Sequence, residues 1–204
     1  MNNEISVFIE YKNVQLQQNV NYQKPFIKLL SEIKPKRILE IGTGVGGFTL
    51  FLRDTLNEIG LNKTPIKTFD IYHRTDQFKD EHNLENIDFN LYNIFNDDYE
   101  LEKVDEIKSF IQSEGITLVL CDGDSKVNEF KQLSPLLKIG DVIMAHDYIF
   151  NRQIFESDFF EKIWNWCEVT DEDINQTCSE QNLKDFMMED FEKIVWVCKR
   201  KTDS

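Results

Sequence analysis

The chain has 204 residues, of which 41 % are hydrophobic, and a formal net charge of −14. This length suffices for one full hydrophobic core, and no linker rich in proline or glycine divides it, so we expect a single domain over residues 1–204. The excess of negative charge disfavours nucleic acids and anionic membranes as partners, since binding to both depends on clustered Lys and Arg.

The cysteine pattern and the lack of targeting segments indicate a cytoplasmic setting. Cys121, Cys167, Cys178 and Cys198 are scattered, without a C-x-x-C pair or the spacing of a metal site. Cys121 and Cys198 lie in apolar runs, where a buried, reduced thiol is expected. The N-terminus lacks a basic segment followed by an apolar one, and no apolar run approaches the roughly 20 residues of a membrane span.

Strand-like and helix-like segments alternate through most of the chain. Residues 1–21 are polar and form an arm, with a short strand or helix at 5–9; a lid, an oligomer contact and a loose segment are all open roles. Five strand–helix alternations predict a parallel, doubly wound α/β sheet with right-handed crossovers. In chain order, we expect a helix at 22–33, a strand at 38–41, a helix from 48 to 54, strands at 66–70 and 87–92, a helix at 99–114, a strand at 116–121, a helix at 127–137 and a strand at 141–146.

The C-terminal tail has a different composition. An aromatic, amphipathic segment covers 154–166, and a strongly acidic one covers 168–180, in which we expect residues 170–173 to form a solvated loop. A short helix is expected at 183–191, and a last strand begins at 193 and ends at 198.

A glycine-rich turn joins the first buried strand to its helix. Gly42, Gly44 and Gly47 match the dinucleotide pattern G-x-G-x-x-G, which by itself is a weak signal. Glycines at this spacing let the backbone approach a ligand closely, and amides at the helix start then face that ligand. Glu40, two residues before the first glycine, would repel a pyrophosphate but would accept from an ammonium group. The acid of the next strand, Asp70, follows Gly42 by more than the roughly 20 residues typical of nicotinamide-binding folds.

Acid–x–G–x–G–x–G followed by a second strand that ends in Asp resembles the class I S-adenosylmethionine-dependent methyltransferases. The resemblance implies a Rossmann-like, mostly parallel seven-stranded sheet with helices on both faces and one antiparallel C-terminal strand. It also implies a cofactor-binding core at 22–148 and C-terminal helices with a hairpin at 149–204. A glycine turn in an α/β protein without a ligand is the alternative.

The resemblance also implies which residues hold the cofactor, since ligands of open α/β sheets sit at the carboxyl ends of the strands. Glu40 and the glycines would contact the methionine part, and Asp70 would accept from both ribose hydroxyls, unless it is a helix cap or a solvated strand end. Asn93 would contact adenine, with Ile94 packing on the ring. The expected cofactor contacts are Glu40, Gly42, Gly44, Asp70, Asn93, Ile94 and Asp122.

Two acids end neighbouring strands, Asp122 in Asp-Gly-Asp and Asp147 in His-Asp-Tyr. Carboxylates suit a hard cation such as Mg²⁺, which would orient a substrate oxygen and lower its pKa, so both are candidate metal ligands. These motifs resemble a branch of the family that methylates hydroxyl groups, with macrocin and rhamnosyl O-methyltransferases and the group named after cephalosporin hydroxylase. His73 and His82 are weaker metal candidates, and a solvated face explains them more simply.

The general base departs from that branch. Many members carry a histidine three residues after the strand acid, whereas this chain has Ser125 there. Lys126, which would need a lowered pKa, and His146 are the candidate catalytic residues. His146 as a packing residue at a strand end is the alternative. Asp124 lies either beside the metal or at the N-cap of the following helix.

Three functions follow from these patterns. The first is S-adenosylmethionine-dependent O-methylation of a small-molecule or sugar hydroxyl, with or without Mg²⁺. The second is a methyltransferase-like binding or scaffold protein without turnover, which Ser125 would explain. The third, a nicotinamide-dependent oxidoreductase, is disfavoured by Glu40 and the position of Asp70. The acceptor cannot be identified from these patterns, and association into a homo-oligomer is left open.

Overall fold

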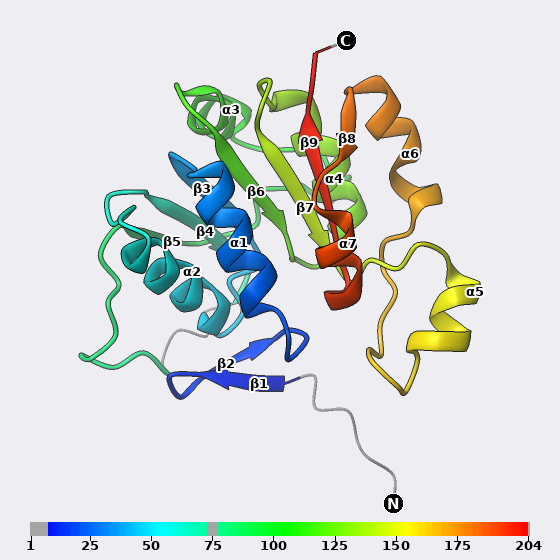
Figure 1. The fold of residues 1–204 in the computed structure, drawn as a ribbon. Coiled ribbons are helices and arrows are strands. Elements are labelled where there is room, and N and C mark those ends of the chain that lie inside the picture. The colour runs from blue at the N-terminus through cyan, green and yellow to red at the C-terminus, as the bar shows by residue number, and fades with distance from the viewer. Residues whose placement is uncertain (1–7, 73–76, 204) are drawn as a thin grey trace, which may run out of the picture.

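The structure, a computed structural model, describes residues 8–72 and 77–203. Within these residues a seven-stranded sheet has the order β5-β4-β3-β6-β7-β9-β8 (Figure 1). All neighbouring strands pair in parallel except β9, which is antiparallel to both of its neighbours. The strands are β3 (Arg37–Ile41), β4 (Ile66–Asp70), β5 (Ile87–Leu91), β6 (Thr117–Cys121), β7 (Val142–His146), β8 (Leu183–Asp185) and β9 (Trp196–Lys201).

Helices cover both faces of the sheet. They are α1 (Gln23–Ile33), α2 (Gly47–Glu58), α3 (Val104–Gln112), α4 (Lys126–Leu133), α5 (Arg152–Ile154), α6 (Asp171–Glu180) and α7 (Met188–Phe191), with short turns η2 (Ser134–Leu136), η3 (Phe155–Phe159) and η4 (Glu192–Ile194). Successive strand residues point to opposite faces, so Ile38 packs with α1, α2 and α7 while Leu39 packs with α3, α4 and α6. The predicted doubly wound, mostly parallel α/β fold with an antiparallel C-terminal strand is confirmed.

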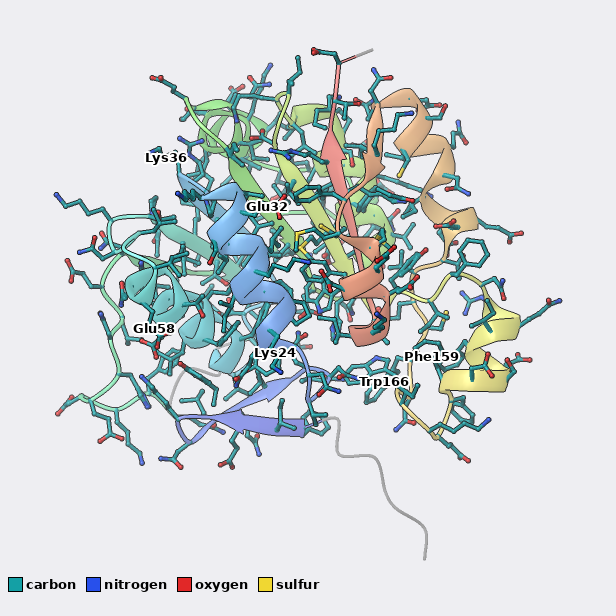
Figure 2. The ribbon with its side chains drawn as sticks, viewed as in Figure 1. Lys24, Glu32, Lys36, Glu58, Phe159 and Trp166 are labelled. Atoms are coloured by element: carbon teal, nitrogen blue, oxygen red, sulfur yellow. The ribbon has the colours of Figure 1, made fainter. Side chains whose placement is uncertain are left out.

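The outer sides of α1 and α2 carry charged residues. Lys24, Glu32 and Glu58 are exposed and point away from the sheet (Figure 2). Phe26 and Leu30 on the inner side of α1 are fully buried. The apolar stripe predicted at 22–33 therefore forms the inner face of this amphipathic helix.

The N-terminal arm forms a hairpin from β1 (Phe8–Tyr11) and β2 (Val14–Gln17). The second strand crosses the start of α2, where a Cβ on Gly47 would lie 2.4 Å from the carbonyl oxygen of Gln15. Gly47 therefore lets the hairpin lie directly against the glycine-rich turn. The first part of the element expected at 5–9 lies outside the described residues.

Three predictions for the tail differ from the structure. The last strand, expected at 193–198, is β9 at Trp196–Lys201, because residues 192–194 form the turn η4 and Val195 has a left-handed φ of +59°. Residues 170–173 begin α6 instead of forming a loop: Thr170 and Asp173 make a capping box, and the acids of the first turn complement the helix dipole. The segment 183–191 starts as strand β8, because pairing with β9 at the sheet edge outweighs its helical pattern, and only its end forms α7.

All four cysteines are unpaired and buried, as expected for Cys121 and Cys198. Desolvation raises the pKa of the Cys178 thiol to about 11, which keeps this thiol protonated at neutral pH. In the part of the chain that the structure describes, no helix has the length and apolar character needed to cross a bilayer.

Candidate active site

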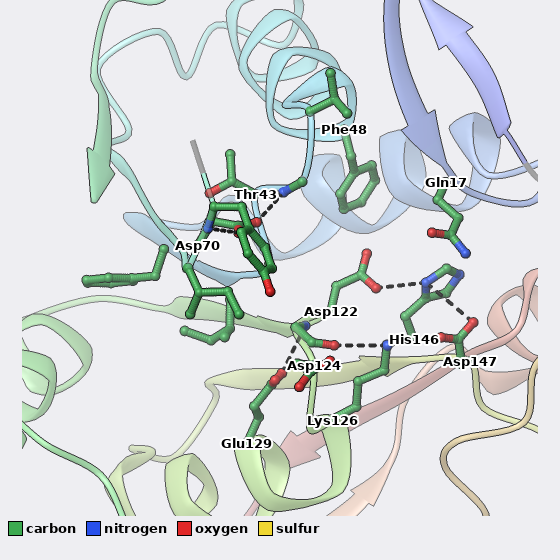
Figure 3. A pocket seen from close by; sticks show the side chains of 18 of the residues that line it. Gln17, Thr43, Phe48, Asp70, Asp122, Asp124, Lys126, Glu129, His146 and Asp147 are labelled. Atoms are coloured by element: carbon green, nitrogen blue, oxygen red, sulfur yellow. Dashed lines mark hydrogen bonds and ion pairs between the residues drawn. The ribbon is translucent and has the colours of Figure 1, made fainter. Parts of the chain in front are cut away.

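A cavity of about 380 Å³ opens at the carboxyl ends of β3, β4, β6 and β7. This is the edge at which parallel sheets bind ligands, and the volume lies within the roughly 300–1,000 Å³ of small-molecule sites. Two groups of residues face each other across it (Figure 3), with the N-terminal hairpin closing a further side. We call them the glycine side, made of Gly42, Gly44, Asp70, Asn93 and Phe95, and the acid side, made of Asp122, Lys126, His146, Asp147 and Glu168.

Gly42 brings the two sides into contact. Its φ is +92°, in the left-handed region, and a Cβ there would lie 2.1 Å from the backbone carbonyl oxygen of Asp122. Only glycine lets the turn after β3 and the loop after β6 approach this closely. The glycine signal in the sequence therefore reflects a packing requirement as well as an approach to a ligand.

Asp70 is held by backbone amides at the end of β4. The Gly44 N–H donates to Asp70 Oδ2 at 2.7 Å, and the Tyr72 N–H donates to Oδ1 at 2.8 Å. Each carboxylate oxygen can accept a further hydrogen bond, and the side chain is only half-buried at the cavity wall. The structure thus presents Asp70 as a fixed acceptor.

Glu40 lies behind the glycine turn and does not line the cavity. It is fully buried; Oε2 accepts from the Thr49 hydroxyl at 2.7 Å, and Oε1 has no partner among the described residues. Burial raises the pKa of Glu40 to about 7. Direct contact between Glu40 and a ligand, as the sequence predicted, therefore lacks support from this arrangement.

After β5, the polar residue of the cavity wall is the predicted one, whereas the apolar residue lies one position later in the chain. Asn93 lines the cavity, and its Oδ1 accepts from the Phe95 N–H at 3.0 Å. Ile94 is 1 % exposed and packs in the core on the α3 side of the sheet, away from the cavity. Phe95 supplies the apolar surface expected from Ile94.

His146 and Asp122 form a dyad on the acid side. His146 Nδ1 lies 2.8 Å from Asp122 Oδ1, and the ring stacks on Trp196 with 4.7 Å between ring centroids. The imidazole is 2 % exposed, yet its Nε2 has no partner among the described residues. Burial by itself lowers the pKa of His146, but the charges of Asp122 and Asp147 outweigh burial and raise it. One ring nitrogen is therefore anchored, and the other is buried without a partner among the described residues.

Gln18, just after the hairpin, completes this dyad. Its Nε2 donates to Asp122 Oδ2 at 2.9 Å, and its Oε1 accepts from the Trp196 indole N–H at 2.8 Å. The side chain is 1 % exposed. Sequence reasoning missed Gln18 because it lies in the polar arm, 104 residues from its partner Asp122, and no local motif marks it.

Lys126 and Asp147 form an ion pair in the same wall. Lys126 Nζ lies 3.0 Å from Asp147 Oδ2 and 2.9 Å from Glu168 Oε2, and Asp147 Oδ1 accepts from the Trp164 indole N–H at 2.6 Å. Burial by itself lowers the pKa of Lys126, but Asp122, Asp147 and Glu168 together raise it above its ordinary value. A general base needs a lowered pKa, so the structure does not support Lys126 in that role.

Glu129 organises the loop between Asp122 and α4. Its carboxylate accepts from the N–H groups of Gly123 and Ser125, each at 3.1 Å, and burial raises its pKa to about 7. Ser125, and not Asp124, occupies the N-cap position of α4. Asp124 is exposed at the cavity rim.

The carboxylates predicted as metal ligands are already engaged. Both oxygens of Asp122 contact His146 and Gln18, and both oxygens of Asp147 contact Trp164 and Lys126. Across residues 8–72 and 77–203, no group of three or more His, Cys, Asp or Glu is arranged to hold a metal ion. Because an ammonium group lies against Asp147, these residues do not fit a divalent cation between the two acids.

The second candidate metal segment gives no support either. His82 Nδ1 accepts from the Lys79 N–H at 3.0 Å, and Nε2 lies 3.0 Å from the Lys12 carbonyl oxygen. Both ring nitrogens are therefore engaged, Nδ1 within this loop and Nε2 with the turn of the hairpin. His73 lies outside the described residues.

Solved methyltransferase structures share this fold at low sequence identity. An apo structure of CmcI aligns with a TM-score of 0.70 and 14 % identity over 96 % of this chain and 77 % of that chain. A CmcI structure with Mg and S-adenosylmethionine has a TM-score of 0.66, the same identity and the same coverage. The Podospora anserina methyltransferase PaMTH1, bound to S-adenosylhomocysteine, has a TM-score of 0.55 and 18 % identity over 87 % of this chain and 76 % of that chain.

Sequence comparison identifies the family. No curated protein sequence matches the chain. The family model described as rhamnosyl O-methyltransferase/CmcI matches residues 3–197, which confirms the resemblance stated from the glycine turn and the two acid motifs. Since the match covers nearly the whole chain, this protein belongs to the rhamnosyl O-methyltransferase/CmcI family.

Proposed function

We propose that this protein is an S-adenosylmethionine-dependent O-methyltransferase that acts on a hydroxyl group of a small molecule or sugar. The observation that carries the proposal is one cavity in which the glycine side faces a dyad with an unpartnered, buried imidazole nitrogen. Family membership and the ligands held by the similar CmcI and PaMTH1 structures support this choice of cofactor.

The glycine side is suited to the nucleoside. Asp70 would accept from the ribose hydroxyls through lone pairs that the Gly44 and Tyr72 amides leave available. Asn93 would contact the adenine edge, and Phe95 would replace Ile94 as the apolar neighbour of the ring. When bound, S-adenosylmethionine supplies the methyl group as a sulfonium.

The acid side is suited to the acceptor. His146 Nε2 takes the proton of the acceptor hydroxyl, while Asp122 holds the Nδ1–H and stabilises the imidazolium that results. Gln18 donates to the other oxygen of Asp122, Oδ2, and so holds the carboxylate in place; the imidazole therefore keeps one orientation. No step of this proposal uses a divalent cation.

The dyad also favours an enzyme over the scaffold alternative. That alternative depended on Ser125, which occupies the position of the family's histidine. Here the Ser125 hydroxyl accepts from the Asn128 side chain, and the imidazole comes from His146. We place this activity in the cytoplasm, on a small molecule. Neither nucleic acid nor membrane is a partner in this proposal, since the net charge of −14 disfavours both.

Two measurements test the proposed function. Calorimetric titration should show binding of S-adenosylmethionine and no binding of NAD. A panel of sugar and phenolic hydroxyl acceptors should then release S-adenosylhomocysteine, with His146→Asn as the inactive control. Binding of NAD in place of S-adenosylmethionine would refute the cofactor, and binding without release from any acceptor would favour the scaffold function.

A further inference from the structure

The Lys126 ammonium group has an oxygen partner for each of its three N–H donors. Besides Asp147 and Glu168, it donates to the Gly123 carbonyl oxygen at 3.0 Å. The partners come from the loop after β6, the end of β7 and the segment before α6, so one group joins three parts of the chain. The side chain is 8 % exposed and reaches from the start of α4 into the acid side (Figure 3).

The position of Lys126 in its helix is electrostatically unfavourable. It is the first residue of α4, where the helix dipole is positive and acidic side chains are preferred. The helix dipole therefore does not favour a buried cation at this position. The carboxylates of Asp147 and Glu168 do, and they belong to the site.

A cation is needed there because the acid side concentrates negative charge. Asp122, Asp147 and Glu168 all line one cavity; the side chains of Asp147 and Asp122 are 5 % and 17 % exposed, whereas that of Glu168 is 43 % exposed. Like charges in a poorly solvated site repel strongly unless a positive charge lies between them. A CmcI structure of similar fold contains Mg. In this chain the ammonium lies against Asp147 Oδ2, and the other oxygen of Asp147 accepts from Trp164.

We propose that the Lys126 ammonium takes the place of a divalent cation in this active site. Lys126 is then a positioning residue: it holds Asp147 and Glu168 and balances their charge, so the enzyme works without Mg²⁺. This inference rests on the proposed function for its effect on turnover, but its metal-binding consequence does not. Removing the ammonium should free Asp147 Oδ2 and Glu168 Oε2 to bind a divalent ion with oxygen ligands.

Titration with Mn²⁺, followed by electron paramagnetic resonance, tests the substitution directly. The wild-type protein should leave Mn²⁺ free, Lys126→Ala should bind it, and Lys126→Ala combined with Asp147→Asn should lose it again. Lys131→Ala, an exposed lysine on the same helix, is the matched control and should behave as wild type. Circular dichroism confirms that each variant is folded.

The outcomes separate clearly. Mn²⁺ binding to wild type that Asp147→Asn abolishes would overturn the proposal, because a metal site would then coexist with Lys126. Binding to neither wild type nor Lys126→Ala would overturn it too, since Lys126 would be an ordinary ion pair. If turnover is found, a chelator should leave the wild-type rate unchanged; if none is found, the Mn²⁺ result still stands on its own.

Discussion

The two sides of the cavity are built differently. On the glycine side, the contacts that shape the site are made by backbone: the Gly44 and Tyr72 amides fix Asp70, and Gly42 meets the carbonyl of Asp122. On the acid side, they are made by side chains from distant segments, with Gln18 bound to Asp122 and Lys126 bound to Asp147. A backbone site tolerates change in most side chains, whereas a side-chain network depends on every member.

The largest effect is expected at His146. His146→Asn keeps a donor for Asp122 but removes Nε2, so kcat should fall by roughly 10²- to 10⁴-fold, with the affinity for S-adenosylmethionine unchanged. Release of S-adenosylhomocysteine and calorimetry measure the two quantities. Equal losses in kcat and in the affinity for S-adenosylmethionine would show that the acid side also contributes to cofactor binding.

The pH profile of the wild type sharpens the same point. The base must be neutral to accept a proton, and the charges of Asp122 and Asp147 raise the pKa of His146 above its ordinary value of 6.5. Activity should therefore be low at acidic pH and rise through a midpoint above 6.5. A midpoint below 6.5 would contradict the assignment of His146 as the base.

Asp70 tests the glycine side. Asp70→Ala removes a charged hydrogen-bond acceptor, typically about 1.5–3 kcal/mol, and should weaken S-adenosylmethionine roughly 10- to 100-fold. Asp70→Asn keeps one acceptor oxygen and should lose less. Calorimetry of both variants measures the difference, and unchanged affinity in Asp70→Ala would refute the ribose contact.

Glu40 connects the glycine side to stability. Its folded pKa of about 7 lies above the ordinary 4.5, so the folded state binds the proton more tightly and loses stability as pH rises from about 4.5 to about 7. Glu40→Gln should remove this loss and be more stable than wild type by about 3 kcal/mol at pH 8, with a difference below about 1 kcal/mol at pH 5. Urea unfolding at both values measures it, and an equal difference at both would exclude titration of Glu40.

The smallest effect is expected at Gln18. Gln18→Leu keeps the volume but leaves Asp122 with one partner fewer, a loss of about 1 kcal/mol or roughly fivefold in kcat. Gln153→Leu, at an exposed glutamine of α5 that does not line the cavity, is the matched control. A Gln18→Leu variant as active as Gln153→Leu would show that the contact between Gln18 and Asp122 does not contribute to turnover.

Features within one strand–turn–helix unit were predictable because their signals are local. The apolar run of β3, the glycine turn and the strand ending at Asp70 determined the sheet, the family and the placement of the cavity. The prediction of a loop at 170–173 was wrong because the sequence of a capping box resembles that of a solvated loop when few apolar residues follow it. The apolar residue at the cavity wall is Phe95 and not Ile94, the predicted one, since the turn after β5 sets which residue faces the cavity.

By itself, the sequence determined that the glycine-rich turn would lie with Asp122 and Asp147 at one edge of a parallel sheet. Strand periodicity and the handedness of the crossovers leave few other arrangements of these strands. Only the tertiary structure decided what those acids contact. Gln18 donates to Asp122, which lies 104 residues later in the chain. The acids around Lys126 raise its pKa, so this candidate base stays a cation. Such contacts depend on distances between segments, which no local pattern encodes.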